Sequence, residues 1–146
     1  MKYKVSTLLH WFGMGVTPII VVFITILSLT PPSDIAEIVS IVPFGDKGAH
    51  VIAYAAMAFC MMCAVGAGGS EDTIKSTIHR NRRKMISIMI LLCIIGGAIE
   101  LVQPLFSRGA EWGDLLADCV GGVLGLCLGT VVITGVQRWE RKRGKQ

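Results

Sequence analysis

The chain has few charged residues. Only 16% of its 146 residues are Asp, Glu, Lys or Arg, and 53% are hydrophobic, whereas an ordinary soluble domain is about 25% charged. This composition argues against a soluble globular protein. No stretch alternates strictly between apolar and polar residues, which argues against a transmembrane β-barrel. The uncharged residues are instead concentrated in long apolar runs.

Four of these runs are long enough to cross the hydrocarbon core of a bilayer, which takes about 20 residues of helix. They cover approximately residues 11–29, 48–66, 85–103 and 115–134. The sequence therefore predicts an all-α integral membrane protein, a bundle of four transmembrane helices that forms a single membrane domain over residues 1–146. A short helix on the membrane surface is expected over residues 35–39.

The first run begins after basic residues, as a signal peptide does. However, residues 11–29 are long for the apolar part of a signal peptide, and no Ala-x-Ala cleavage site follows. We expect this run to be retained as a span. Cleavage would leave three spans with the new N-terminus outside.

The basic residues predict an orientation. Twelve of the 14 fall before the first span, between the second and third spans, or after the fourth. They are Lys2, Lys4, Lys75, Arg80, Arg82, Arg83, Lys84, Arg138, Arg141, Lys142, Arg143 and Lys145. The positive-inside rule then places both termini and the loop between the second and third spans in the cytoplasm. We expect the protein in the cytoplasmic (inner) membrane. Seven of the ten acids lie on the opposite side. The basic segments are expected to contact anionic lipid headgroups, and no nucleic-acid partner is expected.

The five cysteines all fall in the predicted spans. Cys60 and Cys63 have the spacing of a redox motif, but no histidine or acid accompanies them in their apolar segment. Free cysteines behave as small hydrophobic residues, so we expect these two to pack in the interior.

The third run ends with polar residues. Glu100 and Gln103 are three positions apart and therefore share one face of a helix. Pro104 is expected to end that helix, because it lacks a backbone N–H. A carboxylate inside a span is costly unless it is paired, protonated or hydrated, so another part of the chain must meet Glu100.

The second run begins with a polar stripe. Asp46, His50 and Tyr54 follow one another at four-residue intervals, which places them on one side of a helix. Asp46 can be explained as an acid in the first turn, where it faces the positive end of the helix dipole. His50 and Tyr54 lie deeper and are expected to face other helices rather than lipid.

The fourth run combines acids with small residues. Asp114 and Asp118 are one turn apart at its start, and Gly121, Gly125 and Gly129 continue at four-residue spacing. Such a glycine stripe allows a second helix to approach closely, within the chain or in a homo-oligomer. The close contact is expected to lead to the two aspartates.

Nine polar residues are thus predicted at the outer third of the second, third and fourth spans. They are Asp46, Lys47, His50, Tyr54, Glu100, Gln103, Arg108, Asp114 and Asp118. One explanation is structural: Lys47 or Arg108 forms an ion pair with Glu100 or Asp118. The other is an outward-facing pocket between these three spans that binds a polar or phosphate-bearing group. The acids outnumber the bases, so ion pairing alone would leave some of the negative charge unbalanced. This excess favours the pocket.

The order of these residues resembles the VanZ-like family of membrane proteins. The elements are Asp46-Lys47-x-x-His50 with Tyr54, Glu100-x-x-Gln103, Arg108, and Asp114-x-x-x-Asp118-x-x-Gly121, within about residues 44–130. The family's pattern usually has an asparagine at the position of Asp118. The family is named for a protein associated with low-level resistance to the glycopeptide teicoplanin. The resemblance implies a cell-envelope setting and supplies no reaction.

Three functions remain open from the sequence. The first is binding or modulation of a lipid-linked or glycopeptide-like ligand. The second is an enzyme acting on a lipid-linked envelope substrate, with His50 or Glu100 as general base. The third is a small transporter, which would need a homo-oligomer because four spans rarely enclose a path. No cofactor is predicted. Asp114 and Asp118 could ligate a divalent ion, but without an HExxH or phosphatase-like motif no metal site is predicted.

Overall fold

The computed structural model of the chain describes residues 4–66 and 74–144, except for the side chains of residues 74–80. The basic side chains of Lys2, Lys75, Arg80 and Lys145, used above for orientation, lie outside the described part. The described elements are α1 (Val5–Leu29), α2 (Pro32–Ile41), α3 (Gly45–Gly66), α4 (Ile74–Val102), the 3-10 turn η1 (Gln103–Phe106) and α5 (Trp112–Arg143).

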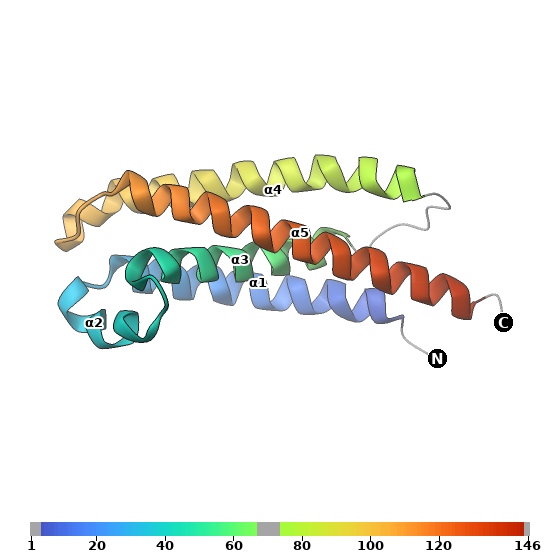
Figure 1. Cartoon of the computed structure of the whole chain (residues 1–146), viewed down its shortest axis with the longest axis horizontal. Coiled ribbons are helices and arrows are strands. Elements are labelled where there is room, and N and C mark those ends of the chain that lie inside the picture. The colour runs from blue at the N-terminus through green and yellow to red at the C-terminus, as the bar shows by residue number, and fades with distance from the viewer. Residues whose placement is uncertain (1–3, 67–73, 145–146) are drawn as a thin grey trace.

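Four of these helices form an elongated bundle, with α1, α3, α4 and α5 lying along a common axis (Figure 1). Within the described ranges, these four are long and apolar enough to cross a membrane. The predicted all-α bundle of four membrane-crossing helices is confirmed. Both termini lie at one end of the bundle, called here the terminal end, whereas α2 lies at the other, the α2 end (Figure 1).

The helices are longer than the apolar runs that predicted them. The fourth run was expected over residues 115–134, but α5 extends over Trp112–Arg143. At 1.5 Å per residue this helix is about 48 Å long, which exceeds a hydrocarbon core of about 30 Å. A short helix is present as α2 around residues 35–39, where one was predicted, and α4 ends at Val102, just before Pro104 as expected.

The glycine stripe of α5 packs against α3, the most extensive contact between two helices. A Cβ atom at Gly121 or Gly125 would overlap the backbone carbonyls of Val51 or Ala55, respectively. A Cβ atom at Gly129 would lie 2.8 Å from the Cβ atom of Met62, which is also on α3. The predicted close approach is therefore confirmed, and it occurs within one chain.

The core lies around α3. Tyr54, Met57 and Met62 are fully buried and pack with Leu92 of α4 and Ile133 of α5. Cys60 and Cys63 are buried as free thiols on the same helix, in agreement with the packing role expected for them. The outer face of α1, by contrast, presents exposed apolar side chains that suit contact with lipid.

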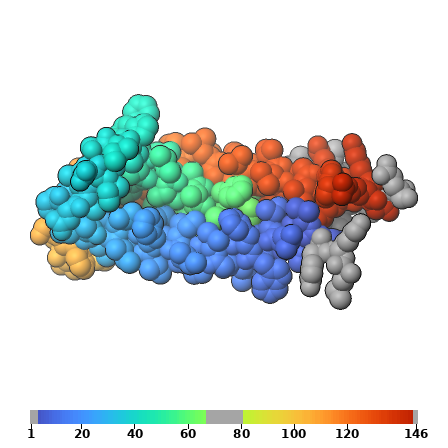
Figure 2. All heavy atoms as spheres, turned by 90° about the horizontal axis from the view of Figure 1, so that it is seen from below, coloured from blue at the N-terminus to red at the C-terminus, as the bar shows by residue number. Residues whose placement is uncertain are grey.

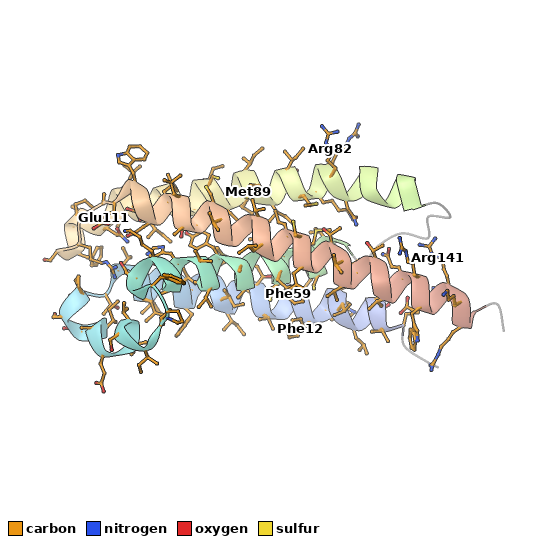
Figure 3. All side chains as sticks on the ribbon, viewed as in Figure 1. Phe12, Phe59, Arg82, Met89, Glu111 and Arg141 are labelled. Carbon is orange, nitrogen blue, oxygen red and sulfur yellow. The ribbon has the colours of Figure 1, made fainter. Side chains whose placement is uncertain are left out.

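At the terminal end, side chains of the other three long helices hydrogen-bond the last carbonyls of α3. The last carbonyls of a helix have no partners within it. His10 of α1, Lys84 of α4 and Gln137 of α5 each hydrogen-bond one of the carbonyls of residues 64–66. Figure 3 shows Arg82 and Arg141 toward this end and Glu111 at the α2 end, so the two ends differ in charge.

Candidate functional site

The nine predicted polar residues lie at the α2 end, and most of them are buried. The first turns of α3 carry Asp46, Lys47, His50 and Tyr54, while α4 and η1 carry Glu100 and Gln103. The connection to α5 and its first two turns carry the others, Arg108, Asp114 and Asp118. Lys47 is exposed and Asp46 half-buried, whereas the remaining seven are buried.

A buried hydrogen-bonded group joins α3 to α5. The His50 Nδ1 atom lies 2.8 Å from Oδ1 of Asp118, and the Tyr54 hydroxyl donates to the same carboxylate. The imidazole and phenol rings stack, with their centroids 6.5 Å apart. Because a carboxylate accepts from Nδ1–H, the lone pair of this imidazole is left on Nε2. Asp118, where the VanZ-like pattern usually has an asparagine, therefore orients His50.

Gly96 of α4, which is not among the predicted site residues, provides the space for this group. A Cβ atom there would lie 2.8 Å from Oδ2 of Asp118 and 3.1 Å from the Tyr54 hydroxyl, whereas one at Gly97 would meet nothing within 4 Å. The available signal was the Gly-Gly pair within an otherwise bulky apolar segment.

Lys47 connects the start of α3 to the start of α5. Its Nζ atom lies 2.9 Å from Oε2 of Glu111 and 3.2 Å from Oδ1 of Asp114. The Lys47 and Glu111 side chains are 54% and 62% exposed, so solvent screens this pair and it contributes little to stability. The contact with the buried Asp114 orients a carboxylate that faces the interior.

Arg108 lies in the segment between η1 and α5. It links this segment to the C-terminal end of α1 and to the first turn of α3. It donates to Oδ2 of Asp46 at 2.9 Å and to the carbonyls of Leu27 and Thr30 at 3.4 and 3.3 Å. The two carbonyls belong to the C-terminal end of α1, where a cation interacts favourably with the helix dipole.

The ion pairs differ from those predicted. Among the described residues, neither Lys47 nor Arg108 pairs with Glu100 or Asp118. Both cations do form ion pairs, as the structural explanation expects, but with acids other than those two. The reason is geometric. Lys47 lies in the first turn of α3, beside the first turn of α5, and Arg108 points toward the end of α1.

Glu100 and Gln103 are only partly hydrogen-bonded. Oε2 of Glu100 accepts from the backbone N–H of Glu111 at 2.9 Å, and Nε2 of Gln103 donates to the Ser28 carbonyl at 3.2 Å. The Oε1 atom of each is buried without a hydrogen-bond partner in the described structure. Buried polar atoms are rarely left in this state, which makes them acceptors for water or a ligand.

A cavity of about 460 Å³ lies next to this group, between α1, α2 and α3. Its polar lining includes Asp46, His50 and Arg108, and its walls are mostly apolar side chains, among them Phe23, Ile24, Leu27, Ile35, Ile38, Ile52 and Ala56. Figure 2 shows α2 projecting from the side of the bundle at this end.

The cavity differs in position from the predicted pocket between the second, third and fourth spans. The glycine contact brings α5 so close to α3 that little space remains between them. The polar residues lie together at the α2 end, but the open space lies on the α1 side of α3.

The same group contains possible metal ligands. Asp46, His50 and Asp114 each offer one ligand atom, and the three atoms lie within 4.8 Å of one another. The sequence predicts no metal site and offers only Asp114 and Asp118 as a pair of possible ligands. Asp118 is instead bonded to the opposite nitrogen of the imidazole.

No family model, curated protein or solved structure matches the chain. The resemblance to the VanZ-like family stays a prediction that rests on the ordered residues. The function has to be inferred from the cavity and the polar group beside it.

Proposed function

We propose that this chain is a VanZ-like protein of the cell envelope that binds an amphipathic ligand, either lipid-linked or glycopeptide-like. The apolar part of the ligand lies in the cavity between α1, α2 and α3. Its polar head lies against Asp46, His50 and Arg108 at the α2 end.

The cavity carries this proposal. Its volume of about 460 Å³ falls in the range of about 300–1,000 Å³ that is usual for small-molecule sites. Apolar walls with a few charged groups at one side suit a molecule that is itself apolar along one part and polar at the other. A uniformly apolar cavity would offer no partner for a headgroup, and a uniformly polar one would not hold a hydrocarbon chain.

Arg108 suits an anionic headgroup. A guanidinium has five N–H donors and matches phosphate or carboxylate in a two-point contact. Arg108 contacts Asp46 and two carbonyls of α1, so donors remain for a ligand in the cavity that it lines.

The proposal includes an orientation. The protein lies in the cytoplasmic membrane with both termini in the cytoplasm, so that the α2 end faces outward. The basic residues toward the terminal end, including Arg82, Arg138 and Arg141, support this orientation. An outward site is accessible to envelope precursors and to glycopeptides such as teicoplanin.

Native mass spectrometry with lipid extraction tests the cavity. Ala56 is an exposed residue that lines it, so Ala56→Phe would fill space that the ligand needs. Ala98 is an exposed alanine of α4 outside the cavity lining, and Ala98→Phe is the matched control. The wild type and the control are expected to retain a distinct amphiphile that Ala56→Phe loses.

Bulk phospholipid on all three proteins would contradict the proposal. A cell assay extends the test to the envelope. At equal expression, the wild type and Ala98→Phe should change teicoplanin susceptibility alike, while Ala56→Phe should behave as the strain without the protein. The same susceptibility in all strains would reject the glycopeptide ligand and leave the lipid-linked one.

One observation favours an enzyme as second candidate. Asp118 holds Nδ1 of His50, which leaves Nε2 of this cavity-lining histidine as a general base for a hydroxyl or water. Purified protein incubated with envelope lipids should then convert one species over time, as followed by mass spectrometry. Conversion by the wild type but not by His50→Gln is expected. Equal conversion by both would exclude His50 as the base.

A further inference from the structure

Two side chains at the polar end of the cavity, those of Asp46 and His50, converge with Asp114 of α5 on one point. The His50 Nε2 atom lies 3.8 Å from Oδ2 of Asp114, and an oxygen of Asp46 completes a set whose atoms lie within 4.8 Å of one another. Bonds of about 2.1 Å place two ligands of one ion at most about 4.2 Å apart. A small side-chain rotation therefore brings all three onto one ion.

The histidine already has the arrangement of a metal ligand. A ligating imidazole usually donates its other N–H to a carboxylate, which fixes the tautomer and the ring orientation. Asp118 bonds His50 Nδ1 at 2.8 Å, and Tyr54 donates to Asp118 in turn. Nε2, the atom that faces Asp114, is left to coordinate.

Both carboxylates are held through one oxygen as well. Arg108 bonds Oδ2 of Asp46 at 2.9 Å, and Lys47 bonds Oδ1 of Asp114 at 3.2 Å. The other oxygen of each carboxylate remains for an ion. All three ligands are thus oriented from behind by a different residue, which is the usual support of a metal site.

The charge of the group is not balanced by its own cations. Lys47 and Arg108 are its two cations, and they face five carboxylates, those of Asp46, Glu100, Glu111, Asp114 and Asp118. Glu100 is only 8% exposed, its Oε1 has no partner in the described structure, and it interacts electrostatically with His50, Asp114 and Asp118. An excess of carboxylates, of which those of Glu100, Asp114 and Asp118 are buried, together with an unpartnered oxygen is what a divalent cation offsets.

We propose that Asp46, His50 and Asp114 bind one divalent ion of the Zn²⁺ or Mn²⁺ type. The imidazole selects such ions over Mg²⁺ and Ca²⁺, which prefer all-oxygen sites. Three protein ligands leave at least one coordination position open, as in catalytic rather than structural metal sites. If the proposed function holds, a phosphate oxygen of the ligand would occupy that position beside Arg108.

The wild-type protein alone provides the first test. The full chain is purified in detergent without a polyhistidine tag, treated with EDTA, desalted and titrated with MnCl₂ or ZnCl₂. We expect one ion per chain after desalting, measured by inductively coupled plasma mass spectrometry. Electron spin-echo envelope modulation of bound Mn²⁺ should show a directly coordinated imidazole nitrogen. A stoichiometry near zero, or Mn²⁺ without nitrogen coupling, would overturn the proposal.

Variants provide the second test. Loss of a residue that only orients a ligand typically lowers metal affinity about 10–100-fold, and Asp118→Asn should weaken Zn²⁺ binding by about this factor. His50→Gln and Asp114→Asn remove ligands and should weaken Zn²⁺ binding by more. Glu37→Gln, an exposed acid of α2, is the matched control and should bind as the wild type does. Size-exclusion chromatography checks that each variant remains folded.

Unchanged affinity in a folded His50→Gln protein would place the ion elsewhere and reject the site. A variant that does not fold leaves the decision to the nitrogen coupling of the wild type. These experiments measure the bound ion and not the amphiphile, so their failure would leave the amphipathic ligand standing. Failure of the cavity test with Ala56→Phe would likewise leave the metal site standing.

Discussion

Gly96 is the residue on which the His50–Asp118–Tyr54 group most directly depends. Its missing side chain leaves the space in which the Asp118 carboxylate and the Tyr54 hydroxyl meet next to α4. A Cβ atom 2.8 Å from an aspartate oxygen has no room unless that carboxylate moves. Because Asp118 fixes His50, the displacement would reach the imidazole that faces the cavity.

Substitution of the two adjacent glycines of α4 tests this role. Gly96→Ala should lower the free energy of unfolding by about 1–3 kcal/mol, since overpacking forces neighbouring groups to shift. Gly97→Ala adds a methyl group in open space and should be neutral or stabilise the helix by up to about 1 kcal/mol. Thermal unfolding in detergent measures both. A similar rise in melting temperature for the two variants would contradict the role given to Gly96.

Which residues meet at this site was predictable, but not which atoms pair. Charged and polar residues near the same ends of three apolar runs have to meet, because lipid offers them no partners. The pairing depends on helix rotation and side-chain reach, which periodicity does not define. Lys47 therefore reaches Glu111 and Asp114 rather than Glu100. Glu111, treated only as one more acid, offers its carboxylate to Lys47 and its backbone N–H to Glu100.

At the scale of elements, α5 is the helix that two others contact through glycine. Gly121 and Gly125 lie against the backbone of α3, while a Cβ atom at Gly122 would lie 3.1 Å from side-chain atoms of α4. The stripe that begins at Asp118 thus continues into backbone-to-backbone contact. One face of α5 thus both carries Asp118 of the polar group and allows α3 to approach closely.

Substitution of two glycines of α5 distinguishes loss of the α3–α5 contact from a change in helix propensity. Gly125→Ala would overlap the Ala55 carbonyl, a backbone atom that cannot rotate away, whereas Gly135→Ala meets nothing within 4 Å. We expect Gly125→Ala to cost at least about 1–3 kcal/mol of stability through separation of α3 and α5. Gly135→Ala should cost none. Equal unfolding midpoints for the two variants in denaturant would show that the contact is looser than described.

The number and type of helices followed from apolar length, whereas their ends and the cavity did not. Helical hydrogen bonds continue past the apolar run in α5, where Arg141, Lys142 and Arg143 suit the negative end of the helix dipole. The cavity was missed because α1 and α2 contribute mainly apolar side chains to it. Such residues look the same in sequence whether they face lipid, a neighbouring helix or a ligand.

At the scale of the whole molecule, charge and length are distributed along one axis. The acidic group, the cavity and α2 occupy one end, while the other end carries basic side chains and the hydrogen bonds that hold the end of α3. The α5 helix is about 48 Å long at 1.5 Å per residue, which exceeds a hydrocarbon core of about 30 Å, and its last turn is basic. A bundle of this kind has one favoured orientation in a membrane that attracts Lys and Arg to its cytoplasmic face.

Reporter fusions decide which way the bundle points. Green fluorescent protein fused after Gln146 should fluoresce, and alkaline phosphatase at the same position should be inactive. A cytoplasmic C-terminus allows green fluorescent protein to fold, whereas alkaline phosphatase becomes active only outside the cytoplasm. Alkaline phosphatase inserted between α2 and α3, after Pro43, should be active. Replacing Arg138, Arg141, Lys142 and Arg143 by Gln should reduce this asymmetry, since it removes the charges that retain the C-terminal segment inside. Active alkaline phosphatase after Gln146 in the unaltered chain would place the cavity and its polar group on the cytoplasmic side, where the ligand would have to be an intracellular precursor.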